Sequence, residues 1–464
     1  MAITAAFMLP HPPLILKEVG RGQERKIQKT IQGYQEAARR IGEAKPETIV
    51  LISPHQVMYA DYFHLSPGHR ASGDFGAFQA AGTRIEVSYD KEFTEYLCRL
   101  AALEEFPAGT AGEQSRQLDH GTMVPLYFVN QHWTGYKLVR IGLSGLSFPD
   151  HYELGQLIKA AAKGLNRNTV IIASGDLSHR LKEDGPYGYQ EEGPEYDRKI
   201  MDVMERAAFG ELLEFSESFC ERAGECGHRS LCIMAGALDR TRVKCQLHSC
   251  EGPFGVGYGI CAYETEGEET GRDLLEQYKQ RERERILDQR KQEDDYVRLA
   301  RQTIQSYVRT GKTPPHSLDL PAEMTDCQAG VFVSIKEYGR LRGCIGTIQA
   351  VQRSIAEEIL VNAISAAVRD PRFSPIQEKE LDFLTISVDV LGAPEPISST
   401  DQLDPKKYGV IVTNGTRRGL LLPNLEGVDH AEDQVRIAKE KAGIRPEEKV
   451  FLERFQVIRH SAIA

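Results

Sequence analysis

Three short runs of aliphatic and β-branched residues in the first 180 positions are each followed by a histidine. His11 follows the run 3–10, His55 follows the run 48–54, and His179 follows the run 169–178. Runs of this kind are typical of buried parallel strands, so each histidine is expected just beyond the carboxyl end of a strand. In an open α/β sheet that edge is where ligands bind. The pattern predicts an α/β fold with these histidines gathered at one sheet edge.

The region 1–264 alternates strand-like and helix-like segments, which predicts an α/β domain with a mostly parallel central sheet. Strands are expected at 3–8, 48–53, 137–143 and 169–174, and two further strand-like runs near 243–249 and 255–264 close the region. Helices are expected near 24–44, 91–103, 151–165, 194–208, 210–216 and 227–238.

The segment 265–292 is dense in both signs of charge and predicts a solvated helical linker, with a partner-binding helix as the alternative. A second domain is expected over 293–464. It begins with an amphipathic stretch at 296–307, and strands at 329–336, 383–392 and 408–413 accompany a helix at about 351–368. This order indicates an α+β domain.

Composition excludes several classes of protein. The formal net charge of −10 argues against nucleic acid or an anionic membrane as the main partner. No apolar run approaches the roughly 18 residues that a membrane-spanning helix needs, and the N-terminus lacks the basic region of a signal peptide. The 9 cysteines contain no Cys-x-x-Cys pair and fit reduced thiols better than disulfides. A cytoplasmic protein is therefore expected.

Each histidine taken alone has an ordinary structural interpretation. His11 lies between two prolines and could cap a turn, and the stretch 119–121 could be a helix N-terminus with Asp119 as its cap. The stretch 176–179 could likewise be a capping turn. Taken together and in order, however, they predict a functional site. Five further histidines lie in polar or loop contexts and are expected at the surface, namely His64, His69, His132, His151 and His248. His228 is instead a candidate for a supporting role beside the site.

The motif series resembles the class III extradiol ring-cleavage dioxygenases of the LigB type. The resemblance is carried by Pro10-His-Pro-Pro13, Ser53-Pro-His55, Asp119-His-Gly121, Ser174-Gly-Asp-Leu-Ser-His179 and Gly252-Pro-Phe-Gly-Val-Gly-Tyr258. These motifs span nearly all of 1–264, and the related Memo-like proteins share the fold. The resemblance implies a probable non-haem, metal-dependent oxidoreductase that cleaves a small aromatic or phenolic, catechol-like substrate.

The family's chemistry implies ferrous iron held by two histidines and one carboxylate, an arrangement that leaves adjacent positions open for substrate and dioxygen. Carried over by motif, His11 and His55 match the imidazole ligands, and Glu225 is the expected carboxylate. Memo-like proteins resemble the same stretch through a Cys-Gly pair, so Cys226 is an equally good match for the third ligand. A thiolate there would shift the preference from Fe(II) towards copper or zinc.

The same resemblance assigns the proton chemistry. His179 matches an acid/base that takes a proton from the substrate hydroxyl, because an imidazole titrates near neutral pH. His120 would form a hydrogen bond with the substrate or the bound oxygen. Asp176 is a candidate for orienting a histidine.

Residues from about 293 resemble the AMMECR domain, also called AmmeMemoRadiSam system protein A, and by that nomenclature the first domain resembles system protein B. The resemblance is carried chiefly by Leu341-Arg-Gly-Cys-Ile-Gly346 and Ala367-Val-Arg-Asp-Pro-Arg-Phe373. Cys344 beside Arg342 would be a nucleophile or a substrate anchor. The alternative is a packed turn with a small buried thiol.

Three functions are consistent with these features. The leading one is an iron(II)-dependent extradiol dioxygenase fused to an AMMECR domain. The second is an oxygen-independent metal enzyme, hydrolytic or other, and the third is a metal-binding adaptor without turnover. The system's name implies a radical-SAM protein as partner in the last two cases. Fold analogy alone adds the expectation of a homo-oligomer.

Overall fold

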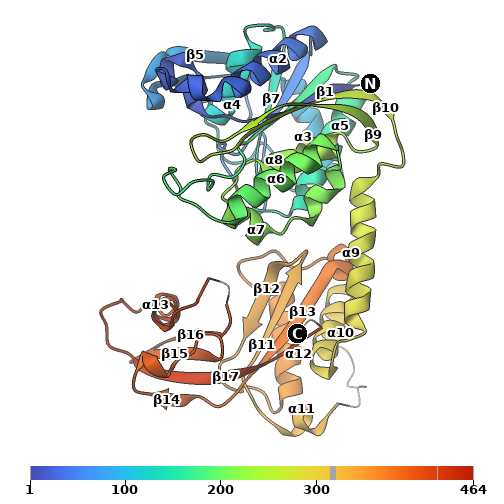
Figure 1. Ribbon diagram of the computed structural model, residues 1–464. Helices are drawn as coiled ribbons and strands as arrows, with labels where there is room; N and C mark the ends of the chain where they lie inside the picture. The colour runs from blue at the N-terminus through green and yellow to red at the C-terminus, as the bar shows by residue number, and fades with distance from the viewer. Residues whose placement is uncertain (1, 314–319, 426, 463–464) are drawn as a thin grey trace. The chain divides into compact units, whose positions relative to one another are not determined.

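The computed structural model describes residues 2–313, 320–425 and 427–462. The chain divides into two compact units, Met1–Lys279 and Gln280–Ala464 (Figure 1). The boundary falls inside helix α9 (Leu274–Arg290), within the segment expected to be a linker. This helix buries Leu275, Tyr278 and Ile286, so it is not solvated along its whole length.

The first unit is built on a six-stranded sheet with the order β7-β2-β8-β1-β10-β9. Its strands are β1 (Ile3–Leu9), β2 (Thr48–Ser53), β7 (Lys137–Gly142), β8 (Thr169–Ser174), β9 (Thr241–Glu251) and β10 (Tyr258–Glu268). The first four run parallel, and β10 and β9 pair antiparallel at one side. The predicted, mostly parallel sheet is confirmed.

Helices cover both faces of this sheet, which explains why its central strands are apolar except for a threonine at the start and a serine at the end of β2 and β8. All residues of β2 and β8 are buried. Helices α2 (Gln28–Ala44) and α4 (His120–Val129) pack on one face, and α3 (Lys91–Leu103), α5 (Phe148–Gly164) and α8 (His228–Ala237) pack on the other. The unit is completed by α1 (Lys17–Gly20), α6 (Glu192–Glu205), α7 (Glu217–Ala223) and the short 3₁₀ turns η1 (Pro13–Ile15), η2 (Gln23–Ile27), η3 (Gly76–Phe78) and η4 (Phe209–Glu214).

A β-hairpin that the sequence analysis did not predict packs against α4. Its strands are β4 (Arg70–Phe75) and β5 (Ala80–Ser88), and a separate two-stranded pair joins β3 (Phe63–His64) and β6 (Ala108–Gly109). The hairpin buries alternate residues only, such as Ala71 and Phe75 on one strand and Ile85 and Val87 on the other. Its apolar pattern is therefore short and interrupted, which explains why it was missed.

The second unit contains a seven-stranded antiparallel sheet with the order β12-β11-β13-β17-β15-β16, and β14 also pairs with β17. Its strands are β11 (Val331–Glu337), β12 (Arg340–Gly346), β13 (Leu384–Leu391), β14 (Glu395–Ile397), β15 (Tyr408–Asn414), β16 (Arg417–Leu421) and β17 (Phe451–Ser461). Helices α10 (Asp295–Thr310) and α12 (Ile355–Val368) enclose the main core, with α11 (Ala322–Asp326) beside α12, and α13 (Ala431–Lys441) packs on β15 and β16. The 3₁₀ turns are η5 (Glu378–Phe383) and η6 (Thr400–Gln402). The α+β prediction is confirmed.

None of the helices in the described parts of the chain combines the length and apolar composition that a membrane span requires.

Candidate metal centre

The carboxyl edge of the parallel strands carries a cluster of imidazole rings. Strand β1 ends two residues before His11 and β2 ends two residues before His55, while His120 begins helix α4 above the same edge. The ring centroids of His11 and His55 lie 4.7 Å apart, and those of His55 and His120 lie 4.0 Å apart. The structure thus brings together three histidines that are far apart in the sequence.

The orientation of His11 is set by a hydrogen-bond chain through Nδ1, and its Nε2 faces His55 and Cys226. The Ser174 hydroxyl donates to the Gly121 carbonyl at 2.6 Å, so at 2.9 Å it accepts from Nδ1 of His11. The proton of this imidazole is therefore on Nδ1, and Nε2 carries a lone pair. The backbone N–H of His11 also donates to Asp176 at 2.7 Å, which fixes the start of the loop. A hydrogen bond of this kind on the far nitrogen is typical of metal-binding histidines.

His55 and His120 are positioned by the capped start of helix α4. The Asp119 side chain accepts from the Thr122 backbone N–H at 2.9 Å, from the Ser53 hydroxyl at 2.5 Å and from Arg140 at 2.7 Å. Gly121, in the first turn of α4, lies close to the His55 ring, because a Cβ atom at this position would be 3.3 Å from His55 Cδ2. The helix start is thereby held against the end of β2.

Cys226 completes a group of three potential metal ligands with His11 and His55. The Nε2 atoms of the two histidines are 2.9 Å apart, and Cys226 Sγ is 3.6 Å from His11 Nε2. All three ligand atoms lie within 4.8 Å of one another. Ligands bound to one ion at about 2.0–2.1 Å for nitrogen and about 2.3 Å for sulfur are separated by distances of this size. The donor set of two imidazoles and one thiol therefore fits a transition-metal ion.

Two glycines bring Cys226 to the sheet edge. A Cβ atom on Gly175, directly after β8, would lie 2.1 Å from the Cα of Gly227. Only a glycine pair allows this approach, and it places the Asp176 backbone N–H 3.3 Å from Cys226 Sγ, to which it donates. The motif glycines thus serve to place the thiol.

Glu225, the carboxylate first expected as third ligand, has a different role in the structure. Its Oε2 accepts from the backbone N–H of His228 at 2.5 Å, at the start of α8. Burial raises the pKa of this carboxyl group to about 7. Glu225 thus caps a helix N-terminus, and in the described residues the ligand group contains Cys226 in its place.

His179 lies next to this group without a hydrogen-bond partner for its Nε2, although that atom is buried. Its ring stacks at 5.0 Å on Tyr187. Burial lowers the pKa of His179 and the nearby Asp176 carboxylate raises it, whereas burial raises the pKa of Asp176 itself to about 6. His179 is thus a neutral imidazole at neutral pH, with a ring nitrogen available for proton transfer.

Burial also keeps the clustered imidazoles neutral. It lowers the pKa of His11 well below its ordinary value, and it lowers the pKa of His55 against the opposing effect of Asp119. Burial, reinforced by His55 and His11, lowers the pKa of His120 to about 3. Neutral imidazole is the form that binds metal ions.

A cavity of about 420 Å³ adjoins the cluster and is lined by His55 and His120. Phe78, from the turn between the hairpin strands, contributes an aromatic wall, with its ring 5.4 Å from that of His120. His64 also lines this cavity and is 2% exposed, and His151 is fully buried, so the expectation that both lie at the surface is wrong. Nothing in the sequence around His64 indicated that this histidine would line a cavity.

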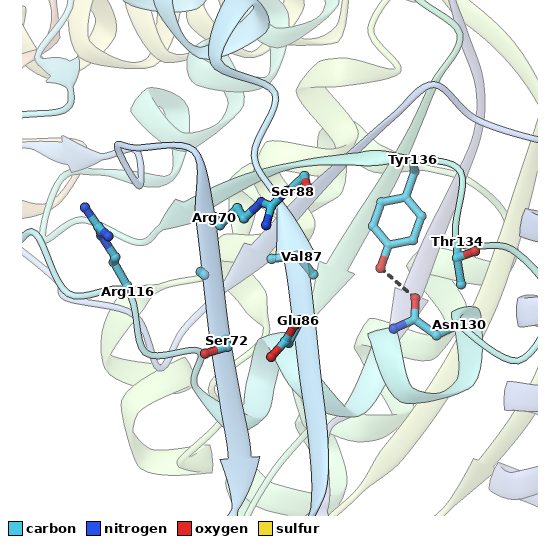
Figure 2. Close-up of a pocket in the computed structure, with 10 residues that line it drawn as sticks. Arg70, Ser72, Glu86, Val87, Ser88, Arg116, Asn130, Thr134 and Tyr136 are labelled. Atoms are coloured by element: carbon cyan, nitrogen blue, oxygen red, sulfur yellow. Dashed lines mark hydrogen bonds between the residues drawn. The ribbon is translucent and has the colours of Figure 1, made fainter.

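A second cavity of about 430 Å³ lies at the hairpin and is lined by strands β4 and β5 together with Tyr136 (Figure 2). Its polar contacts include the Tyr136 hydroxyl, which donates to Asn130 at 2.8 Å. It contains none of the residues predicted from the sequence, so it is not the candidate centre.

In the second unit, the guanidinium group expected beside Cys344 comes from a different arginine. Arg342 donates to Glu380 at 2.6 Å and to the Ser374 carbonyl at 2.7 Å. Arg372 instead donates to the Cys344 carbonyl at 3.0 Å, and Ser334 donates to the Cys344 thiol at 3.2 Å. Arg342 therefore anchors a loop, and Cys344 lies on the sheet next to Arg372.

Comparisons with known proteins agree with the two-unit architecture. Residues 5–261 match the family model described as the catalytic LigB subunit of aromatic ring-opening dioxygenase, and residues 297–460 match the AMMECR1 model. A protein of Clostridium acetobutylicum is 41% identical over 99% of both chains. A protein of Thermotoga maritima is 50% identical over 36% of this chain and 98% of its own length. The crystal structure of PH0010 from Pyrococcus horikoshii is 32% identical, covering 36% of this chain and 90% of its own, with a TM-score of 0.34.

Proposed function

The chain belongs to the family of the catalytic LigB subunit of aromatic ring-opening dioxygenases, with an AMMECR1 domain in its second unit, and from this premise we propose that the first domain is a metal-dependent enzyme with a His-His-Cys centre. His11, His55 and Cys226 would hold the ion. The proposal is carried by one observation, the convergence of the three ligand atoms within 4.8 Å.

The donor set favours a soft ion, zinc or copper(I), over the Fe(II) that a carboxylate ligand would favour. Thiolate and imidazole ligands select such ions, and three protein ligands leave a coordination position for substrate, as in catalytic zinc sites. When bound, the ion supplies Lewis acidity that polarises a substrate oxygen. The lone pair on His11 Nε2, which faces His55 Nε2 at 2.9 Å, supports this assignment because no proton has to leave the His11 atom.

The surrounding residues would bind and deprotonate a small phenolic or carbonyl substrate. His179 is the base, because its buried Nε2 has no partner and the ring is neutral. His120 forms a hydrogen bond to the substrate from the wall of the 420 Å³ cavity. The reaction we propose does not use dioxygen and is hydrolytic or of another oxygen-independent type. The resemblance to the AmmeMemoRadiSam system proteins implies a radical-SAM protein as its partner.

Oxygen-dependent opening of a catechol-like ring remains the second candidate, favoured by the family description itself. It requires iron and dioxygen. A metal-binding adaptor without turnover is the third proposal and predicts that His179→Ala leaves partner binding intact.

The deciding experiment is the metal content of the full chain purified without oxygen, with variants Cys226→Ala, Glu225→Gln and, as a thiol control, Cys344→Ala. We expect stoichiometric zinc or copper in the wild type, in Glu225→Gln and in Cys344→Ala, and its loss in Cys226→Ala. Stoichiometric iron that depends on Glu225 and not on Cys226 would overturn the proposal in favour of ring opening, which oxygen uptake with catechols would then test.

A further inference from the structure

The cavity beside His55 and His120 has one wall with unpaired polar atoms. Gln56 Oε1 and Arg140 Nε are buried and have no hydrogen-bond partner, and both residues line this cavity. His64 lies beside Gln56 in the same lining, and its ring is hydrogen-bonded to the Glu113 backbone. Gln56 is 8%, His64 2% and Arg140 5% exposed. Because buried polar groups in proteins are almost always paired, an unpaired acceptor and an unpaired donor in one cavity point to a ligand or to ordered water.

The hydrogen bonds among these residues determine which donors and acceptors remain available to a ligand. Gln56 Nε2 donates to Ser66 at 2.8 Å and to His64 Nδ1 at 3.0 Å, so Gln56 Oε1 remains an acceptor and His64 Nε2 carries a proton. Arg140 uses its Nη atoms on Asp119 and on the Gln117 carbonyl, which leaves its Nε–H as a donor. The wall therefore presents both an acceptor and a donor.

The charges around the cavity disfavour an anionic ligand group. Its lining includes the carboxylates of Asp74, Glu113 and Asp119 and the single guanidinium of Arg140. That guanidinium is already paired with Asp119 at 2.7 Å. A substrate carboxylate would meet an excess of negative charge, whereas an uncharged group that both donates and accepts would not.

The lining of the same cavity also includes apolar side chains. Phe78, Leu118 and Met123 are among them, with the Phe78 ring against His120. An aromatic ring fits beside these side chains, since aromatic rings pack edge to face at such distances. The cavity thus accommodates a planar apolar body with a polar substituent.

Building on the proposed function, we propose that Gln56, His64 and Arg140 form a specificity subsite that binds an uncharged hydroxyl or primary amide substituent of a small aromatic substrate. The subsite accepts from the substituent through Gln56 and donates to it through Arg140, while His64 holds the Gln56 side chain in place. It selects against a carboxylate substituent at the same position.

The test is binding of catechol and its para-carboxamide and para-carboxylate to the metal-loaded full chain, measured by calorimetry under anaerobic conditions. We expect the carboxamide to bind about tenfold more tightly than catechol, as one or two added hydrogen bonds allow, and the carboxylate to bind more weakly than catechol. Gln56→Met, which keeps side-chain length, should remove most of the carboxamide preference. Gln131→Met, in the exposed turn that follows α4, is the matched control and should keep the preference.

A second variant keeps the inference open to disproof if Gln56→Met does not fold. Gln56→Glu adds a negative charge to the wall, so the carboxylate probe should bind still more weakly. Tighter binding of the carboxylate than of the carboxamide would overturn the subsite. Equal binding of all three probes would also overturn it, because the polar atoms of the wall would then bind only water. No binding of any probe would also overturn it.

The two proposals can fail separately because metal content is read on the same samples. If an ion is bound through Cys226 but the three probes bind equally well, the subsite is disproved and the metal centre stands. If the probes bind selectively but no bound ion depends on Cys226, the metal centre is disproved and the subsite stands.

Discussion

Each unit places a cysteine next to a glycine, Cys226 just before helix α8 and Cys344 within strand β12, yet the two thiols have different neighbours. Cys226 lies 3.6 Å from His11 Nε2 and within ligand distance of His55. Cys344 accepts from the Ser334 hydroxyl and lies beside Arg372, whose guanidinium is held by Asp370 at 2.7 Å. A thiol among lone-pair donors can share a cation with them, whereas a thiol among N–H and O–H donors cannot. The neighbours therefore decide the chemistry of each thiol.

Two carboxyl groups, Asp197 of the first unit and Asp370 of the second, show the same contrast of neighbours, whereas Asp119 in the first unit is paired with Arg140. Burial without a cationic partner raises the pKa of Asp197 in the first unit to about 7. In the second unit the hydrogen bond from Arg372 lowers the pKa of Asp370 to about 2. Asp389 there is likewise held by Arg459 at 2.7 Å and 2.8 Å. The second unit pairs these carboxylates with arginines, while the first leaves buried side chains such as Asp197 and His179 without a cationic or hydrogen-bonding side-chain partner.

The largest expected effect comes from the glycine contact that positions Cys226. Gly175→Ala places a Cβ atom 2.1 Å from the Gly227 Cα, so the loop after β8 has to move. We expect loss of the bound ion and a destabilisation of about 1–3 kcal/mol or more. Denaturant unfolding followed by fluorescence reports on this unit, because the only tryptophan, Trp133, lies in it.

Two control variants sharpen that prediction. Gly82→Ala in β5 meets no atom within 4 Å and should change neither property. Gly343→Ala in β12 would meet the Ala366 carbonyl oxygen at 2.1 Å, so it should destabilise the second unit and leave the metal bound. Retention of the ion in Gly175→Ala would break the proposed link between the glycine pair and the thiol.

The pH dependence of stability should differ between the units. The folded pKa of Asp197, about 7, lies above its ordinary value of 3.8, so its contribution is present below about pH 4 and is lost as the pH rises towards 7. Asp197→Asn should flatten this decline, by up to about 1.4 kcal/mol per pH unit, in fluorescence-detected unfolding between pH 4 and 8.

Asp370 should behave in the opposite sense. Its folded pKa of about 2 lies below the ordinary value, so its contribution is present above about pH 4 and is lost as the pH falls towards 2. An unchanged slope in Asp197→Asn would show that this carboxyl group is ionised in the folded protein at neutral pH.

Thiol reactivity provides a smaller effect that compares the two cysteines directly. We expect the bound ion to slow alkylation of Cys226 at least about tenfold, because a coordinated thiolate is a poorer nucleophile, while Cys344 reacts at the same rate with and without metal. Peptide mapping by mass spectrometry measures both, and the exposed Cys250 and Cys327 are internal standards. Protection of Cys344 would place an ion in the second unit.

The smallest effect is expected for Ser334→Ala, which removes the hydroxyl that donates to Cys344. A hydrogen bond to a partly exposed thiol contributes below about 1 kcal/mol, so hydrogen exchange of β11 should accelerate only slightly and the metal content should not change. A large loss of protection would show that this face of the sheet depends on the Cys344 network.

Much of the fold was predictable because its strands carry strong local patterns. The runs at 48–53 and 169–174 are buried throughout and apolar at their four central positions, since helices cover both faces of β2 and β8. Helix α3 begins and ends where the sequence indicated. The β4–β5 hairpin was not predictable to the same degree, because it buries only alternate positions and its pairing is interrupted near Phe75. Half-buried edge elements leave a weaker trace in the sequence.

The spacing of apolar runs and histidines was enough to predict the sheet edge at which the histidines meet, because the carboxyl ends of parallel strands lie on one side of a sheet. For the third ligand the sequence favoured Glu225 and left Cys226 as the alternative. Both residues lie in the irregular segment before helix α8, so no helical periodicity fixes which of the two side chains faces the imidazoles. Only the tertiary contact between Gly175 and Gly227 decided which of the two faces the imidazoles, and it turned the thiol inward and the carboxylate to the helix cap.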